Sequence, residues 1–191
     1  MNKTLVGLIA VALTLLAYVP YIVDILKEKT RPHLYSWLLW AIVTTIVFAL
    51  QITNHAGAGS YTTLTSALIC FLVISISLKK DIKNDITRSD KIFLTLALTS
   101  LAVWLVAKQA ILSAILATTT DLLAFIPTIR KSWNDPHSET ISTYYLNTLR
   151  FVLVLYALNQ YTVITSLYPI SWLFINGLFA IMLKVRRKDI S

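Results

Sequence analysis

Long apolar segments alternate with short polar stretches along almost the whole chain. A helix that crosses a membrane needs about 20 mainly apolar residues, and seven segments reach or approach that length. Residues 92–129 are nearly continuous and apolar, and would form one helix about 57 Å long, which exceeds a hydrocarbon core of about 30 Å. We therefore predict a tight break at Lys108-Gln109, where the apolar run is interrupted. The seven predicted membrane spans are residues 5–25, 34–52, 61–78, 92–107, 110–129, 141–158 and 163–183.

The composition indicates that lipid solvates the protein. Of the 191 residues, 57% are hydrophobic and only 14% are charged, and the mean hydropathy is +0.70. A soluble domain carries about 25% charged residues. A soluble fold of this size could not hide so much apolar surface. Soluble enzymes, nucleic-acid-binding domains and disordered proteins are thereby excluded, and we predict an all-α integral membrane protein.

The distribution of positive charge predicts how the chain crosses the membrane. Seventeen Lys and Arg against nine Asp and Glu give a net charge of +8. Seven spans would place Lys3 and Lys108 on the side of the N-terminus and Arg150 inside a span. The other fourteen cations would share the opposite side, so the positive-inside rule predicts an outside N-terminus and a cytoplasmic C-terminus. We expect a multi-pass protein of the cell membrane, and the compact loops favour a bacterial inner membrane. The fourteen cations are Lys27, Lys29, Arg31, Lys79, Lys80, Lys83, Arg88, Lys91, Arg130, Lys131, Lys184, Arg186, Arg187 and Lys188.

An internal repeat organises the chain. Residues 15–22 recur at residues 122–129, with five of eight positions identical and a shared proline, Pro20 and Pro127. Both segments run into a basic loop that contains Pro-His. We therefore predict two parallel three-helix repeats joined by a single linker helix, a 3+1+3 arrangement used by transporters with a solute site between the halves. The predicted units are residues 1–80, 81–108 and 109–191.

Two ionisable residues lie deep within predicted spans. Asp121 is near the middle of residues 110–129, and Arg150 is near the middle of residues 141–158. A charge at the bilayer centre costs several kcal/mol unless it is paired or hydrated. We therefore predict that the two residues pair or face one aqueous cavity. Such a pair is either a structural clamp or a site for substrate binding or proton coupling, in which protonation of Asp121 releases Arg150.

Other polar and aromatic residues could complete a site. Asn147 shares a helix face with Thr143 and Arg150 because their spacing is i, i+4, i+7. Trp40 could stack on a sugar or close a gate, or it could simply pack. Trp37 is expected to be an anchor at the membrane interface, and Trp172 an interfacial or packing residue.

The chain resembles the PQ-loop superfamily, which includes the SWEET sugar carriers. The likeness rests on the 3+1+3 layout, on the prolines near basic loops, and on residues 30–36 and the serine-bracketed residues 138–142. It implies that Pro20 and Pro127 are hinges, which the sequence alone leaves open against static kinks. It also implies that Asn176 resembles the pocket asparagine of SWEET-type carriers, whereas an intramembrane asparagine is often only an interhelical hydrogen bond. The family's Pro-Gln pair reads Pro20-Tyr21 and Pro127-Thr128 here.

We therefore expect a carrier of a small polar or charged solute that works by alternating access. The alternative is a non-transporting receptor or assembly partner, which the missing Pro-Gln pairs and the charges confined to one half would fit. No zinc-protease, phosphate-loop or nucleophile pattern is present, so we expect no enzyme activity and no metal or cofactor. The single cysteine, Cys70, excludes an internal disulfide. The candidate site residues are Asp121, Arg150, Asn147, Asn176 and Trp40, with Pro20 and Pro127 as hinges.

Overall fold

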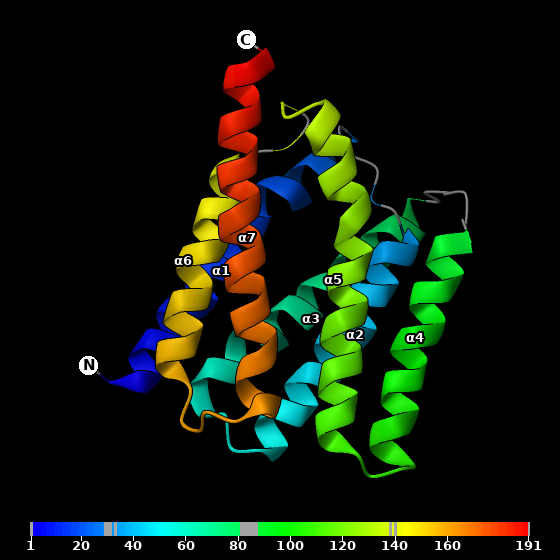
Figure 1. Cartoon of the computed structure of the whole chain (residues 1–191), viewed down its shortest axis with the longest axis vertical. Helices are drawn as coiled ribbons and strands as arrows, with labels where there is room; N and C mark the ends of the chain where they lie inside the picture. Colours follow the sequence, from blue (N-terminus) through cyan, green and yellow to red (C-terminus); the bar gives the residue numbers. More distant parts are fainter. Residues whose placement is uncertain are drawn as a thin grey trace.

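The chain folds into a bundle of α-helices joined by short connections (Figure 1). The computed structural model describes residues 2–28, 32, 34–80, 88–137, 139 and 141–190, and within these ranges it contains no β-strand. Each predicted apolar segment forms one helix, which confirms the all-α prediction. The helices are α1 (Lys3–Leu26), α2 (Leu34–Thr53), the short 3-10 helix η1 (Gly57–Ser60), α3 (Tyr61–Lys79), α4 (Arg88–Leu105), α5 (Ala110–Asn134), α6 (Ile141–Ala157) and α7 (Val163–Ile190).

Four helical segments in the described part are long and apolar enough to cross a membrane. These are Lys3–Leu26, Leu34–Thr53, Gly57–Lys79 and Val163–Lys188. The apolar stretches of α4 and α5 are shorter, and α6 has only 17 residues. α5 and α6 each contain a charged residue near the middle, Asp121 and Arg150 respectively. The fold is thus compatible with a membrane protein, although fewer helices are long and apolar enough to cross a membrane than the sequence predicted.

The predicted break between the fourth and fifth apolar segments is present. α4 ends at Leu105 and α5 begins at Ala110, and Lys108 has a positive φ of 57° that a continuing helix could not contain. The two helices are tied together by reciprocal hydrogen bonds. The Ser113 hydroxyl donates to the Ser100 carbonyl at 2.8 Å, and the Ser100 hydroxyl donates to the Ser113 carbonyl at 3.1 Å.

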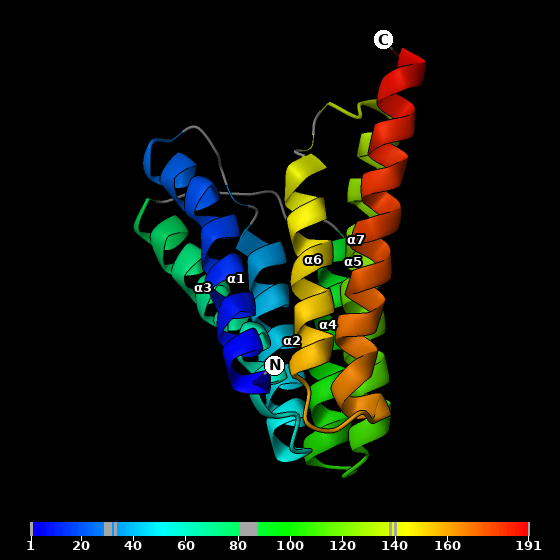
Figure 2. The ribbon, with the colours of Figure 1, turned by 90° about the vertical axis from the view of Figure 1, so that its left-hand side faces the viewer.

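The helices pack in the same order at both ends of the chain. α3 packs against both α1 and α2, and α7 packs against both α5 and α6. We call α1–α3 with η1 the first half and α5–α7 the second half. Across the halves, α1 packs on α6 and α2 packs on α5, while α4 lies against α2 and α5. Figure 2 shows that the two halves diverge towards the end at which α7 terminates.

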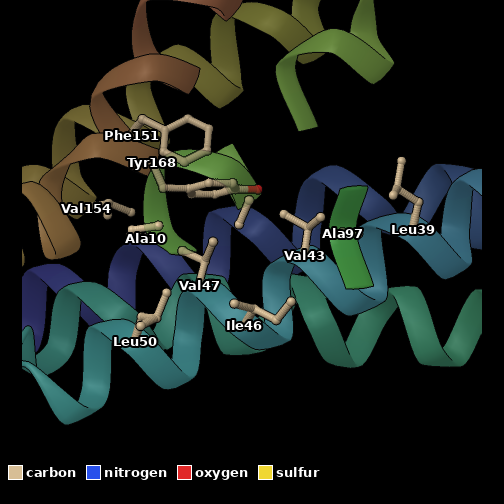
Figure 3. Close-up of a cluster of buried hydrophobic side chains, with 12 residues drawn as sticks. Ala10, Leu39, Val43, Ile46, Val47, Leu50, Ala97, Phe151, Val154 and Tyr168 are labelled. Atoms are coloured by element: carbon tan, nitrogen blue, oxygen red, sulfur yellow. The ribbon is translucent and has the colours of Figure 1, made fainter. Parts of the chain in front are cut away.

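A central apolar cluster joins the two halves. Figure 3 shows Ala10 of α1 and Val47 of α2 beside Phe151, Val154 and Tyr168 of the second half. Each half also has its own cluster, around Trp37 in the first and around Phe125 in the second. In lipid, helices associate through close van der Waals packing and hydrogen bonds, so these packed clusters help to fix the positions of the halves around the cavity described below.

Some residues used in the sequence predictions lie outside the described residues. They are Lys29, Thr30, Arg31, His33, Lys83, Ser138 and Thr140, together with the side chains of Pro127, Arg130 and Lys131.

Candidate functional site

Two connected cavities lie between the halves. The outer one, which we call the vestibule, has a volume of about 740 Å³ and extends to Asp24, Ser36 and Glu139, close to the ends of α1, α2 and α6. The inner cavity has a volume of about 180 Å³. Both are lined by Tyr18, Trp40, Thr143 and Tyr144, so the vestibule leads into the inner cavity. We call the end of the bundle with the vestibule the open end.

All five site residues predicted from the sequence line the inner cavity. Trp40 comes from α2, Asp121 from α5, Asn147 and Arg150 from α6, and Asn176 from α7. Residues 40 and 176 are far apart in sequence but converge here because α2 and α7 both pack against α5. Thr143 also lines the cavity, as the i, i+4, i+7 spacing with Asn147 and Arg150 predicts.

Asp121 is held from one side only. Its Oδ2 atom accepts a hydrogen bond from the Tyr168 hydroxyl at 3.0 Å and from the Trp172 indole N–H at 2.9 Å. Its Oδ1 atom is buried and has no hydrogen-bond partner. The carboxyl group is 1% exposed to solvent. One carboxylate oxygen is therefore available to a group that enters the cavity.

Arg150 reaches from the second half to the first. Its Nη1 atom donates to the Thr14 hydroxyl at 3.4 Å, and that hydroxyl in turn donates to the Ala10 carbonyl at 2.8 Å. The guanidinium lies over the ring of Phe151, with its carbon 4.4 Å from the ring centroid. The residue is only 7% exposed, and its Nε atom is buried without a hydrogen-bond partner.

Of the two alternatives predicted for Asp121 and Arg150, an ion pair or one shared cavity, the structure has the shared cavity. Both residues lie in the described part of the chain, and no ion pair joins them there. The two residues have similar depths, but α7 packs between α5 and α6 and supplies the partners of Asp121. The idea that protonation of Asp121 releases Arg150 therefore loses its basis. A clamp within the second half is also wrong, because Arg150 bonds to Thr14 of the first half.

The two asparagines differ in their hydrogen bonding. The side-chain amide of Asn176 donates to the Trp172 carbonyl at 2.6 Å, one turn earlier in the same helix. This bond is intrahelical, and not the interhelical bond that an intramembrane asparagine often makes. Asn147 Oδ1 is buried without a partner. Asn147 thus adds a second open acceptor to that of Asp121.

Aromatic rings form much of the cavity wall. Trp40 lines both cavities and packs edge-on against Trp37, with ring centroids 5.2 Å apart. The expectation that Trp37 is an interfacial anchor is wrong, because Trp37 is 5% exposed and packs between Tyr21 and Trp40. Trp172, read from the sequence as an interfacial or packing residue, instead binds Asp121. An aromatic residue in an apolar span gives no sequence signal for such a role.

The opposite end of the inner cavity is closed by contacts between the halves, and we call it the closed end. The Lys3 ammonium donates to the Leu158 carbonyl at 2.6 Å, and the Asn159 N–H donates to the Ala56 carbonyl at 2.9 Å. Gly59 lies so close to the second half that a Cβ there would be 2.9 Å from the Val154 carbonyl oxygen. These contacts join η1 and the start of α1 to the end of α6.

A second connection between the halves uses a proline that sequence reasoning missed. Pro169 lies inside α7 and has no N–H to donate to the Thr165 carbonyl four residues earlier. That carbonyl instead accepts a hydrogen bond at 3.1 Å from the side-chain amide of Gln51, a buried residue of α2. The Thr165 carbonyl of the second half, which lacks a helical donor because residue 169 is proline, thus accepts a hydrogen bond from the first half.

At the open end, the described residues form several hydrogen bonds between elements of the same half. Lys80 of α3 donates to the Leu26 carbonyl, and Arg187 of α7 donates to the Pro136 carbonyl. The predicted hinge residue Pro20 lies inside α1 and lines the vestibule. Position 127, the other predicted hinge, lies within α5.

The arrangement can bind a polar group but shows no metal centre. In the described part, no three His, Cys, Asp or Glu side chains lie close enough together to hold a metal ion. The inner cavity instead offers two open acceptors, on Asp121 and Asn147, and one open donor on Arg150. Buried polar groups are normally hydrogen-bonded, so three open ones in one cavity indicate a place for a ligand or for water.

Comparison of the chain with protein-family models, with curated proteins and with solved structures finds no match. Its function therefore has to be inferred from the geometry of the two cavities.

Proposed function

We propose that the protein is a membrane carrier for a small polar or charged solute and that it works by alternating access. The observation that carries this proposal is the pair of connected cavities, open at one end and closed at the other. A carrier needs a central site that is accessible from one side at a time. Unpartnered polar atoms of Asp121, Asn147 and Arg150 give the central cavity the means to bind a solute.

The proposed topology has seven spans in a 3+1+3 arrangement, with α4 as the linker. It is supported by the packing order, because exchanging α1, α2 and α3 for α5, α6 and α7 converts the α1–α6 contact into the α5–α2 contact. The excess of Lys and Arg near the open end supports a cytoplasmic vestibule and a cell-membrane location. In this proposal the structure is the inward-open state.

The cavities favour a carrier over a receptor or assembly partner that does not transport. A protein that only holds a partner does not need an internal cavity, and its intramembrane charges would be expected to neutralise each other. Asp121 and Arg150 instead keep open atoms on one cavity. The missing Pro-Gln pairs affect Pro20-Tyr21, which lies at the vestibule, and not the residues with open polar atoms.

The test is solute uptake by the purified full-length protein in liposomes. Labelled sugars, amino acids and organic acids are offered with and without a proton gradient, which also tests the predicted proton coupling. We expect uptake of at least one compound above that of empty liposomes. Asp121→Asn should lower the initial rate at least about tenfold, because a hydrogen bond to a charged group contributes about 1.5–3 kcal/mol.

The matched control is Asp135→Asn, which removes the same charge from an exposed residue just after α5, away from both cavities. It should leave the uptake rate unchanged. Unchanged uptake in Asp121→Asn, or no uptake of any compound by the unmodified protein, would contradict the proposal.

A further inference from the structure

The inner cavity contains two opposite charges that do not neutralise each other. Asp121 and Arg150 are 1% and 7% exposed, and each keeps one buried polar atom without a partner, Oδ1 and Nε respectively. Their existing partners, Tyr168, Trp172 and Thr14, are uncharged. The cavity is therefore dipolar, with a negative and a positive group that are both open to a ligand.

This charge pattern selects among solutes. An anion could pair with Arg150, but Asp121 would stay unpaired and its negative charge would repel the anion. A cation could pair with Asp121, but Arg150 would stay unpaired and would repel the cation. A neutral sugar would leave both charges without a counter-charge. Since an uncompensated buried charge is strongly unfavourable, a solute that carries both charges is favoured over all three.

The neighbouring groups assign an end to each charge of the solute. Asn147 Oδ1 is an acceptor and has no partner, so it and Asp121 Oδ1 together provide two acceptors for an ammonium group. Arg150 Nε is a donor and suits a carboxylate or another anionic group. The rings of Phe125, Phe151 and Trp172 also line the cavity, and can contact an apolar portion between the charges.

The size of the cavity limits the solute. A volume of about 180 Å³ is below the roughly 300–1,000 Å³ of pockets that hold drug-sized ligands. We propose that the inner cavity binds a small zwitterion, with its ammonium group at Asp121 and Asn147 and its anionic group at Arg150. This inference rests on the proposed function only in taking the inner cavity as the solute site.

The test is calorimetric titration of the detergent-purified full-length protein at neutral pH with solutes of matched length. The zwitterions are glycine, β-alanine, 4-aminobutyrate, 5-aminopentanoate and L-alanine. Butyrate and butylamine each lack one charge of 4-aminobutyrate, and glucose is the neutral compound. We expect at least one zwitterion to bind, and every singly charged or neutral compound to bind at least about tenfold more weakly.

Two variants test which residue binds which charge. In Asp121→Asn the advantage of the zwitterion over a carboxylate of the same length should disappear. In Arg150→Gln its advantage over the amine of the same length should disappear. The control Asp135→Asn should keep the selectivity of the unmodified protein, since Asp135 lies outside both cavities.

The inference would be overturned if a singly charged or neutral compound bound more tightly than every zwitterion, or if no zwitterion bound. It would also be overturned if the selectivity of both cavity variants were the same as that of the unmodified protein. Uptake of a sugar or an organic acid into liposomes without zwitterion binding would refute this inference and leave the carrier proposal standing. Zwitterion binding without uptake of any solute would refute the carrier proposal and leave this inference standing.

Discussion

At the scale of single residues, Asp121 combines a binding role with a cost in stability. Its carboxylate is buried, and only one of its two oxygens accepts hydrogen bonds. Replacing a buried charge by a neutral group often leaves a protein equally stable or more stable. We therefore predict that Asp121→Asn leaves the free energy of unfolding unchanged or raises it by up to about 2 kcal/mol. Tyr168 and Trp172 can still donate to the amide oxygen of the new side chain.

The measurement is thermal unfolding in detergent, followed by the loss of the helical circular-dichroism signal. Cys70 is not used as a reporter because it lines the inner cavity beside Asp121, where a thiol reagent could reach it before the protein unfolds. Arg150→Gln provides the comparison. Unlike Asp121→Asn, it removes a hydrogen bond between the halves and the contact of the guanidinium with the Phe151 ring, so it should lower the unfolding temperature. A large loss of stability in Asp121→Asn would show that the carboxylate is a structural group.

The sequence was sufficient to select the polar residues of the cavity but not their partners. Charges in the middle of apolar spans are costly and therefore stand out, and Asp121, Arg150 and Asn147 were found for that reason or by helical spacing. Tyr168 and Trp172 could not be found in this way. Their rings suit an apolar span, and only the packing of α7 against α5 turns their polar atoms towards Asp121.

At the scale of elements, Pro169 and Gln51 form a coupled pair across the halves. Gln51→Leu removes the side-chain donor of the hydrogen bond to the Thr165 carbonyl and should destabilise the protein by about 1–3 kcal/mol. In a Pro169→Ala background the N–H of residue 169 can donate to that carbonyl, so the same substitution should cost about 1 kcal/mol less.

A double-mutant cycle measures this coupling, with thermal unfolding of the two single variants, the double variant and the unmodified protein. The cycle isolates the pairwise interaction because the separate effects of each substitution cancel. Additive effects of the two substitutions would show that Gln51 does not replace the helical bond lost at Pro169.

The seven α-helices of the described residues could be predicted from the sequence, but the short 3-10 helix η1 and the packing order could not. Apolar length and the break at Lys108-Gln109 are properties of neighbouring residues, and all seven predicted segments form helices. Which helix lies between which others depends on contacts between distant segments. Neighbours in sequence, α5 and α6, were expected to bring their charges together, but α7 packs between them.

At the scale of the whole molecule, the two ends of the bundle are held differently. Among the described residues, the closed end has hydrogen bonds between the halves, such as Lys3 to Leu158, and the open end has hydrogen bonds within each half, such as Lys80 to Leu26. If the halves rock as rigid bodies, weakening the closed end should both open that end and close the vestibule. A static pore or a scaffold would respond at the closed end alone.

Gly59→Ala is suited to this test because the added Cβ would meet the Val154 main-chain oxygen of the other half at 2.9 Å. Two reporter cysteines are placed one at a time in a Cys70→Ala background: Ser166→Cys, buried at the start of α7, and Ser142→Cys, exposed in the vestibule. We predict that Gly59→Ala raises the rate at which a water-soluble thiol reagent modifies the cysteine at 166 and lowers the rate at 142.

Gly177→Ala is the matched control, because a Cβ at that position of α7 has no neighbouring atom nearer than 3.8 Å. It should change neither rate. Faster modification at both reporters in Gly59→Ala would mean that the added methyl group loosens the whole bundle. A change confined to the cysteine at 166 would mean that the two ends do not move together. Only opposite changes at the two ends agree with alternating access, because a rigid-body movement that separates the halves at one end brings them together at the other.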